Sequence, residues 1–173
     1  MTAACVHRRA EPSSSLDTAK SEEALLRAKS LMVPVSGVEP SQLRDTYSAA
    51  RGSAIHAALD ILAPRGTPVL AADGGQVFRL RRNEAGGITI YQLDAGERFV
   101  YYYAHLDRYR DGLSEGARVR QGDVLGYVGT TGNAPPDTPH LHFQLMRYLG
   151  NGRYSGGEPL NPLPFLVRPG RIR

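Results

Sequence analysis

The sequence predicts a mainly β protein, with a single antiparallel β-sheet domain that follows a short N-terminal helix. From Met32 onward, short runs rich in β-branched and aromatic residues alternate with clusters of Gly, Pro, Asn and Asp, which is typical of strands joined by turns. The length of 173 residues suits one compact domain. Heptads, solenoid repeats and alternating helix–strand units are absent from the sequence, which argues against coiled-coil, repeat and parallel-sheet folds.

The chain divides into a tail over residues 1–17, a helix over 18–31, the β domain over 32–168 and a C-terminal tail over 169–173. The first segment is polar and contains the linker signal "EPSSS", so we expect it to be disordered. Asp17 or Thr18 can cap the helix, and acidic residues occupy its first turns. Its apolar stripe is thin, so the helix should lie at the periphery of the domain.

Turn signals within the β domain predict its strands. We expect one hairpin around Asp73–Gly75 and a second around "DAGE", because β-prone runs flank both turns. Two further strands should lie on either side of Gln121–Asp123, and "HLHFQLM" should form another. The proline-punctuated segment "NPLPFLVRPG" should pack over an edge of the sheet.

The formal net charge is +4 and the isoelectric point is about 9.4, which suits an anionic partner or a solubilising surface. The arginines are scattered and the aromatic signatures of nucleic-acid-binding folds are absent, so we expect no nucleic-acid partner. No run of about twenty apolar residues occurs, so we expect no transmembrane segment. We expect the chain to be a monomer.

Cys5 is the single cysteine, which rules out an intramolecular disulfide. It follows "MTAA", and small residues before a cysteine resemble the end of a lipoprotein signal, although the required apolar stretch is missing. Two interpretations stay open, a lipid anchor at Cys5 and an ordinary thiol in the N-terminal tail.

Four of the five histidines fall in the β region, whereas His7 lies in the tail. A strand has a side-chain period of two, so His140 and His142 should share one face while Leu141 and Phe143 point to the core. Such a pair can be a half-exposed polar face or can bind a metal.

His56 and Asp60 lie four residues apart, so they would share a face on a helix and could still converge in a loop–strand segment. Imidazole and carboxylate are ligands that zinc accepts, and three protein ligands with one open position are typical of catalytic zinc. His105 ends an aromatic strand, where it can simply pack. Together, the three motifs contain four histidines and one aspartate, whereas a catalytic zinc ion needs three protein ligands. The two remaining histidines could carry protons near neutral pH.

The stretches "HAALD", "YYYAHL" and "PHLHFQL", in that order, resemble the active-site motifs of the lysostaphin-type (LytM-like) zinc metallopeptidases, which cleave peptidoglycan cross-bridges. The resemblance covers roughly Val33 to Leu166, and "VRQGDVLGYVGTTGN" is similar to a strand–turn segment of the family. It implies a fold like the duplicated hybrid motif, a peptidase domain over 32–168, one zinc ion per chain and peptidoglycan as the partner.

The resemblance also implies roles for single residues. His56, Asp60 and His142 match the zinc ligands, and His105 and His140 match the catalytic histidines. Tyr47 lies nine residues before the first ligand, where some members carry a tyrosine that helps to polarise the scissile carbonyl.

Two departures from the family pattern occur. Ala58 replaces the usual glycine, and its methyl group is tolerable only if the backbone there has an ordinary φ. The stretch "GNAPPDTPH" is longer and richer in proline than the usual link before the histidine pair, so it should form a wall of the substrate groove.

Three other functions fit this sequence less well than a peptidase does. A non-catalytic activator of cell-wall hydrolases should lack some of the ligands, whereas all five positions are filled here. A biotinyl or lipoyl carrier needs a lysine on a hairpin tip, and Lys20 and Lys29 both precede the β region. A non-haem iron oxygenase usually has one residue, not three, between its His and Asp ligands.

The sequence therefore predicts a zinc endopeptidase acting on peptidoglycan stem-peptide cross-links. The Arg-rich, Lys-poor composition and the open lipid-anchor interpretation favour a Gram-negative envelope, with the chain periplasmic or secreted. In that setting, the expected reaction is that of a D,D-endopeptidase.

Overall fold

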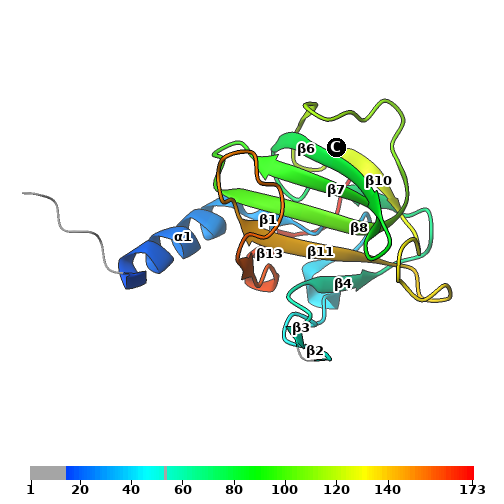
Figure 1. Cartoon of the computed structure of the whole chain (residues 1–173), viewed down its shortest axis with the longest axis horizontal. Helices are drawn as coiled ribbons and strands as arrows, with labels where there is room; N and C mark the ends of the chain where they lie inside the picture. Colours follow the sequence, from blue (N-terminus) through cyan, green and yellow to red (C-terminus); the bar gives the residue numbers. More distant parts are fainter. Residues whose placement is uncertain (1–14, 53) are drawn as a thin grey trace, which may run out of the picture.

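The computed structural model describes residues 15–52 and 54–173 (Figure 1). Cys5, His7 and most of the predicted tail lie outside the described residues, so the anchor and the disorder of the tail stay predictions. Within the described residues, none of the helices combines the length and the apolar character needed to cross a membrane.

The helix α1 spans Ser15–Lys29 and extends from one end of the sheet (Figure 1). It starts before the predicted boundary, so Asp17 and Thr18 lie inside the helix rather than at its cap. It ends two residues before the predicted boundary because Ser30 adopts a left-handed backbone with a φ of 47°. Leu31 then begins the strand β1 (Leu31–Met32).

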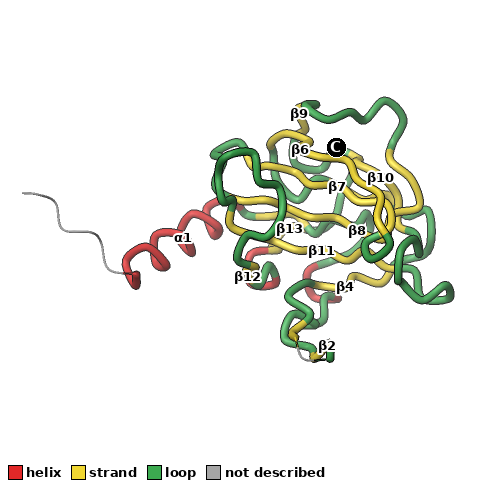
Figure 2. Tube along the Cα trace, in the orientation of Figure 1, coloured by secondary structure: helices red, strands yellow, loops and turns green. Residues whose placement is uncertain are grey.

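One large antiparallel sheet forms the body of the protein, with the strand order β12-β11-β8-β7-β6-β9 (Figure 2). The strand β4 pairs with β11, while β10 pairs with both β8 and β5. The nine strands are β4 (Leu59–Leu62), β5 (Pro68–Leu70), β6 (Gly75–Asn83), β7 (Gly87–Asp94), β8 (Phe99–Tyr109), β9 (Arg118–Val119), β10 (Val124–Val128), β11 (His140–Arg147) and β12 (Pro159–Leu160).

The small elements surround this sheet. They are η1 (Pro40–Gln42), β2 (Ala50–Arg51), β3 (Ala54–Ile55), η2 (Leu163–Phe165) and β13 (Leu166–Arg168). The strands β2 and β3 pair with each other. The proline-punctuated segment supplies η2 and β13, and β13 pairs in parallel with β1.

The structure confirms the predicted hairpin around "DAGE", in which β7 and β8 pair directly. The hairpin predicted around Asp73–Gly75 is wrong, because β5 pairs with β10 and β6 pairs with β7. The Asp73 carboxylate instead accepts hydrogen bonds from Lys29 and Tyr101. The turn that does close a hairpin, between β6 and β7, lies at residues 84–86 and was not predicted.

The main core lies on one face of the sheet, and a smaller buried cluster of Leu93, Val100 and Met146 lies on the other. Along β11, alternate side chains point to these two faces. Leu141, Phe143 and Leu145 are fully buried among large side chains such as Tyr101 and Tyr103. His142 and Gln144 point to the opposite face and are only partly buried. The strand therefore anchors the histidine pair through its apolar side.

Candidate metal centre

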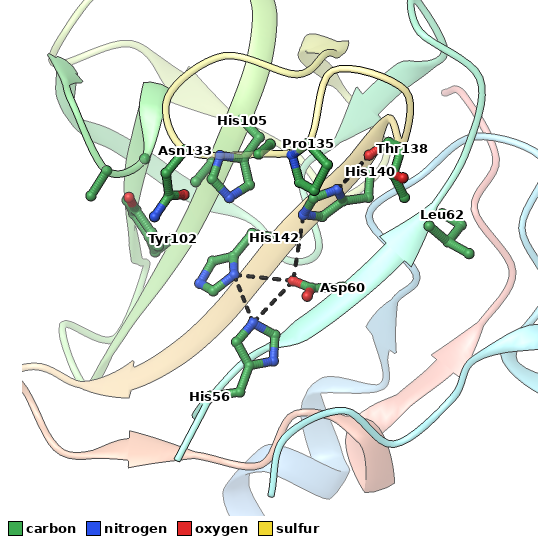
Figure 3. A pocket seen from close by; sticks show the side chains of 14 residues that line it. His56, Asp60, Leu62, Tyr102, His105, Asn133, Pro135, Thr138, His140 and His142 are labelled. Atoms are coloured by element: carbon green, nitrogen blue, oxygen red, sulfur yellow. Dashed lines mark hydrogen bonds and ion pairs between the residues drawn. The ribbon is translucent and has the colours of Figure 1, made fainter. Parts of the chain in front are cut away.

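A cavity of about 510 Å³ lies over β4, β11 and β8, on the face of the sheet opposite the core (Figure 3). All four histidines of the β region line it. The complete lining is His56, Asp60, Leu62, Ala85, Gly86, Tyr102, Ala104, His105, Asn133, Ala134, Pro135, Thr138, His140 and His142.

His56, Asp60 and His142 converge at the floor of this cavity (Figure 3). Antiparallel pairing of β4 with β11 sets His142 directly opposite Asp60, and His56 enters from the loop just before β4. The Nε2 atom of His56 lies 3.0 Å from Nδ1 of His142, and Oδ1 of Asp60 lies 3.1 Å from each of these nitrogens.

This triangle has the dimensions of a metal site. Metal–ligand distances of about 2.0–2.1 Å in a tetrahedral zinc site place neighbouring ligand atoms about 3.3 Å apart. Two imidazoles and one carboxylate also form a donor set that zinc accepts, with one position left open. The three side chains thus fit a single small cation.

Thr46 supports two of these residues and had no signal in the sequence. Its carbonyl accepts a hydrogen bond from Nδ1 of His56 at 3.0 Å, which leaves Nε2 to face Asp60 and His142. Its hydroxyl accepts the backbone N–H of Asp60 at 2.9 Å and donates to the carbonyl of Ala58.

The departure at Ala58 is accommodated by the local backbone. The left-handed conformation in this loop falls on Ala57, with a φ of 58°, whereas Ala58 is not left-handed. Ala58 is fully buried, so its methyl group packs inside the protein rather than narrowing the cavity.

His105 and His140 lie above the triangle, with their ring centroids 5.0 Å apart. Nδ1 of His105 donates to the carbonyl of Thr131 at 2.8 Å, and Nδ1 of His140 donates to that of Thr138 at 2.8 Å. A carbonyl only accepts, so each neutral ring carries its lone pair on Nε2. Nε2 of His140 lies 3.8 Å from Oδ1 of Asp60.

The backbone at His105 is strained, with a φ of 60°. Its N–H donates to the carbonyl of Gly86 at 2.8 Å, and the registers of β8 with both β7 and β10 shift nearby. A left-handed conformation at a non-glycine residue persists only when surrounding contacts hold it, and such strain clusters at functional sites.

The surroundings of Asp60 and His105 lower the pKa values of both side chains. Burial lowers the pKa of His105, and the neighbouring His140 and His142 lower it further, although the Thr131 hydrogen bond acts in the opposite direction. Burial alone would raise the pKa of Asp60, but the hydrogen bond from His142 and the nearby histidines outweigh it and lower that pKa. At neutral pH, Asp60 is therefore an anion and His105 a neutral imidazole.

Tyr47 is the one predicted site residue that does not line the cavity. Its hydroxyl donates to the carbonyl of Pro159 at 2.9 Å, so its proposed contact with a substrate carbonyl stays a prediction. The proline-rich stretch does form a wall, because Asn133, Pro135 and Thr138 all line the cavity. Tyr102 lines it too, and sequence reasoning did not single out that residue.

Together, the antiparallel sheet, the three-ligand triangle and the two further histidines define the class of single-metal hydrolytic sites. The sequence model of Peptidase family M23 matches residues 54–162, and the chain belongs to this metallopeptidase family. The solved catalytic domain of the antimicrobial peptidase lysostaphin from Staphylococcus simulans has the same fold. It is 24% identical to this chain with a TM-score of 0.57, and the match covers 83% of this chain and 96% of that one. The predicted fold class is thereby confirmed.

Two curated relatives show how the chain compares with longer proteins. The L-Ala–D-Glu endopeptidase of Bacillus subtilis is 37% identical over 131 residues, which are 71% of this chain and 39% of the relative. The DD-carboxypeptidase/endopeptidase Mpg of Neisseria meningitidis is 36% identical over 110 residues, which are 63% of this chain and 22% of the relative. The chain thus spans well under half the length of both.

Proposed function

We propose that this chain hydrolyses peptide cross-links of peptidoglycan with the help of one zinc ion held by His56, Asp60 and His142. The observation that carries the proposal is the triangle of ligand atoms, 3.0 to 3.1 Å on each side, with two more histidines in the same cavity. Membership of Peptidase family M23 and the names of the two relatives support this function.

A zinc ion in such a three-ligand site lowers the pKa of bound water and polarises carbonyl groups. The protein supplies the geometry, because each ligand is fixed by a strand pairing or by a backbone hydrogen bond. The ligands are thus preorganised for one cation before it binds.

His105 and His140 supply the proton chemistry in this proposal. A neutral ring whose Nδ1–H is already donated can accept a proton at Nε2 and later return it to the leaving amine. The other ring, once protonated, can donate a hydrogen bond to the oxyanion that develops at the scissile carbonyl. The lowered pKa of His105 keeps that ring neutral near pH 7 and so available as the proton acceptor, which leaves the oxyanion to His140.

The preferred bond is D-alanine to meso-diaminopimelate, cut in a D,D-endopeptidase reaction, and a pentaglycine bridge ranks lower. The two relatives are named for different bonds, so the family alone does not decide between them. The Arg-rich composition favours a Gram-negative envelope, where the chain would be periplasmic or secreted. A net charge of +4 also favours binding to anionic wall strands.

Digestion of purified peptidoglycan by the zinc-loaded chain, followed by mass analysis of the fragments, tests this function. We expect cross-linked dimers to fall to monomers with new free D-alanine ends, and the Asp60→Ala variant to release nothing. Intact peptidoglycan, together with faster digestion by an added cell-wall amidase, would instead establish a non-catalytic activator. Cleavage inside the stem, between L-Ala and D-Glu, would retain the enzyme and reject the preferred bond.

A further inference from the structure

A row of tyrosines leads away from the metal centre across the sheet. Tyr102 on β8 lines the cavity (Figure 3), and its ring centroid lies 6.0 Å from that of His142. Tyr102 pairs in register with Tyr91 on β7, and Tyr91 pairs in register with Arg79 on β6. Cross-strand partners share a face of a sheet, so this row lies on the same face as the cavity.

Ring contacts make the row continuous. The ring centroids of Tyr102 and Tyr91 are 4.6 Å apart, and Tyr154 packs edge-on against Tyr91 with its centroid 4.9 Å away. The Arg81 guanidinium lies 5.1 Å from the ring centroid of Tyr154, within the range of a cation–π contact. Arg81 is itself paired with Glu115 at 2.8 Å.

Arg79 ends the row with most of its hydrogen-bonding capacity unused. Its guanidinium lies over the rings of Phe78 and Tyr154, at 4.8 Å and 5.9 Å from their centroids. Within the described residues, its one hydrogen bond runs from Nη1 to the carbonyl of Phe78, and it forms no salt bridge. A guanidinium carries five N–H donors in a fork that matches a carboxylate. The contacts with the two rings therefore leave the Arg79 guanidinium able to bind an anion.

We propose that the tyrosine–arginine platform, formed by Tyr102, Tyr91, Tyr154 and Arg79, binds a carboxylate-bearing part of the stem peptide beyond the bond that is cut. Arg79 takes the carboxylate in a two-pronged, charge-assisted hydrogen bond. The tyrosine rings cover the aliphatic part of the peptide between that carboxylate and the metal centre. This inference rests on the proposed function, because the platform starts at the proposed catalytic cavity and its charge complements an acidic peptide.

Binding of two matched probes tests the platform without relying on turnover. The probes are a fluorescein-labelled cross-linked stem-peptide dimer with free diaminopimelate carboxylates and its carboxamidated counterpart. Fluorescence anisotropy is measured with the zinc-loaded full chain carrying His105→Ala, so that neither probe is consumed. We expect this chain to bind the free-carboxylate dimer about 10-fold more tightly, since a hydrogen bond to a charged group has that strength.

Further substitutions on β6, made in the His105→Ala chain, test whether Arg79 causes the preference for the free-carboxylate dimer. Arg79→Gln should abolish the 10-fold preference, and Arg79→Lys should keep part of it because the charge remains while the fork is lost. The matched control is Arg82→Gln, which makes the same charge change at an exposed position on the same strand. Equal binding of the two probes, or a preference that survives Arg79→Gln, would overturn the platform.

Cleavage of the same probes by the unsubstituted, zinc-loaded chain separates failure of the platform from failure of the proposed function. If both dimers are cut and bound equally well, the function stands and the platform is wrong. If neither is cut while the preference still depends on Arg79, the platform stands as an acidic-peptide site and the peptidase proposal fails.

Discussion

Three of the cavity histidines are held in orientation by the ring nitrogen that points away from the cavity. Nδ1 of three histidines donates to a backbone carbonyl at 2.8 to 3.0 Å. The pairs are His56 with Thr46, His105 with Thr131 and His140 with Thr138. These bonds fix both the tautomer and the ring plane, so little ordering remains when metal or substrate binds.

Replacing His105 separates proton transfer from metal binding. His105→Ala should retain its zinc, because the ring is not one of the three converging ligands. Turnover should fall by about 10²- to 10⁴-fold, the usual contribution of a general acid or base. Metal content and kcat on a cross-linked dimer are measured on the same preparation, and loss of zinc from this variant would show that the division of roles is wrong.

Thr131 should affect turnover by holding His105 in position. Its hydroxyl accepts the N–H of Ile88 at 2.9 Å and donates to the carbonyl of Leu106 at 2.6 Å, while its own carbonyl holds the imidazole. Thr131→Val removes both hydroxyl bonds at nearly constant volume, and a misplaced base should cost about 10-fold or more in kcat with KM nearly unchanged.

The matched variants for this position are Thr131→Ser and Thr130→Val. The first keeps the hydroxyl and should recover most of the lost turnover. The second makes the same chemical change at the neighbouring threonine and should leave turnover unchanged. If Thr131→Ser is as slow as Thr131→Val, the hydroxyl does not position the histidine.

Among the elements, the pairing of β4 with β11 decides whether the site exists. The register His142–Asp60 places both side chains on the cavity face, and a slip by one residue would turn one of them into the core. The alternation of "HLHFQL" predicts the face of the histidine pair, as the burial of Leu141 and Phe143 bears out. No local pattern could have indicated that the short β4 pairs with a strand some eighty residues later.

The hairpin around Asp73–Gly75 was wrongly predicted for the same reason, because strand pairing depends on segments that are distant in sequence. A turn signal such as Asp73–Gly75 reports local backbone preference, whereas pairing of β5 with β10 depends on contacts distant in sequence. The tyrosine row likewise results from the registers of β6, β7 and β8, in which Tyr91 lies between Arg79 and Tyr102. Such cross-strand neighbours cannot be derived from one strand at a time.

The junction of α1 with the sheet predicts an acid-sensitive contribution to stability. Lys29 Nζ lies 2.8 Å from the carboxylate of Asp73 and 2.9 Å from that of Asp94, and Asp94 also accepts the N–H groups of Arg98 and Phe99. Burial would raise the pKa of Asp94, but these partners outweigh it and lower the pKa below its ordinary value. The stabilisation is therefore present above about pH 4 and is lost as the pH falls through the lower, folded-state pKa.

Asp94→Asn should lower the free energy of unfolding at pH 7 by about 1–3 kcal/mol, because charge-assisted bonds at a buried site are lost. Its stability should also change less than that of the unsubstituted chain between pH 5 and the acid limit. Urea unfolding at several pH values measures both effects, with Asp111→Asn at an exposed position as the control. An unchanged pH dependence in Asp94→Asn would show that this carboxylate does not contribute the linkage.

On the scale of the whole molecule, one face of the sheet packs the main core, and the other holds the cavity beside a smaller buried cluster of Leu93, Val100 and Met146. That second face holds the triangle of His56, Asp60 and His142, the pair His105 and His140, and the tyrosine–arginine platform, and the proline-rich loop forms a wall there. The residues that converge in the cavity could be predicted from sequence, since three short motifs contain them, while their roles stay proposals. The supports from Thr46 and Thr131 could not, because their carbonyls could come from any residue type and their hydroxyl bonds run to segments that only the folded sheet brings close.

The central claim is that His56, Asp60 and His142 bind one zinc ion. The metal content of the full chain, purified without chelators, tests it most directly. We predict about one zinc per chain, the stoichiometry of a three-ligand site, with zinc lost from Asp60→Ala and His142→Ala along with peptidoglycan cleavage. Near-stoichiometric iron with oxygen consumption, or zinc retained in full by both variants, would contradict the account.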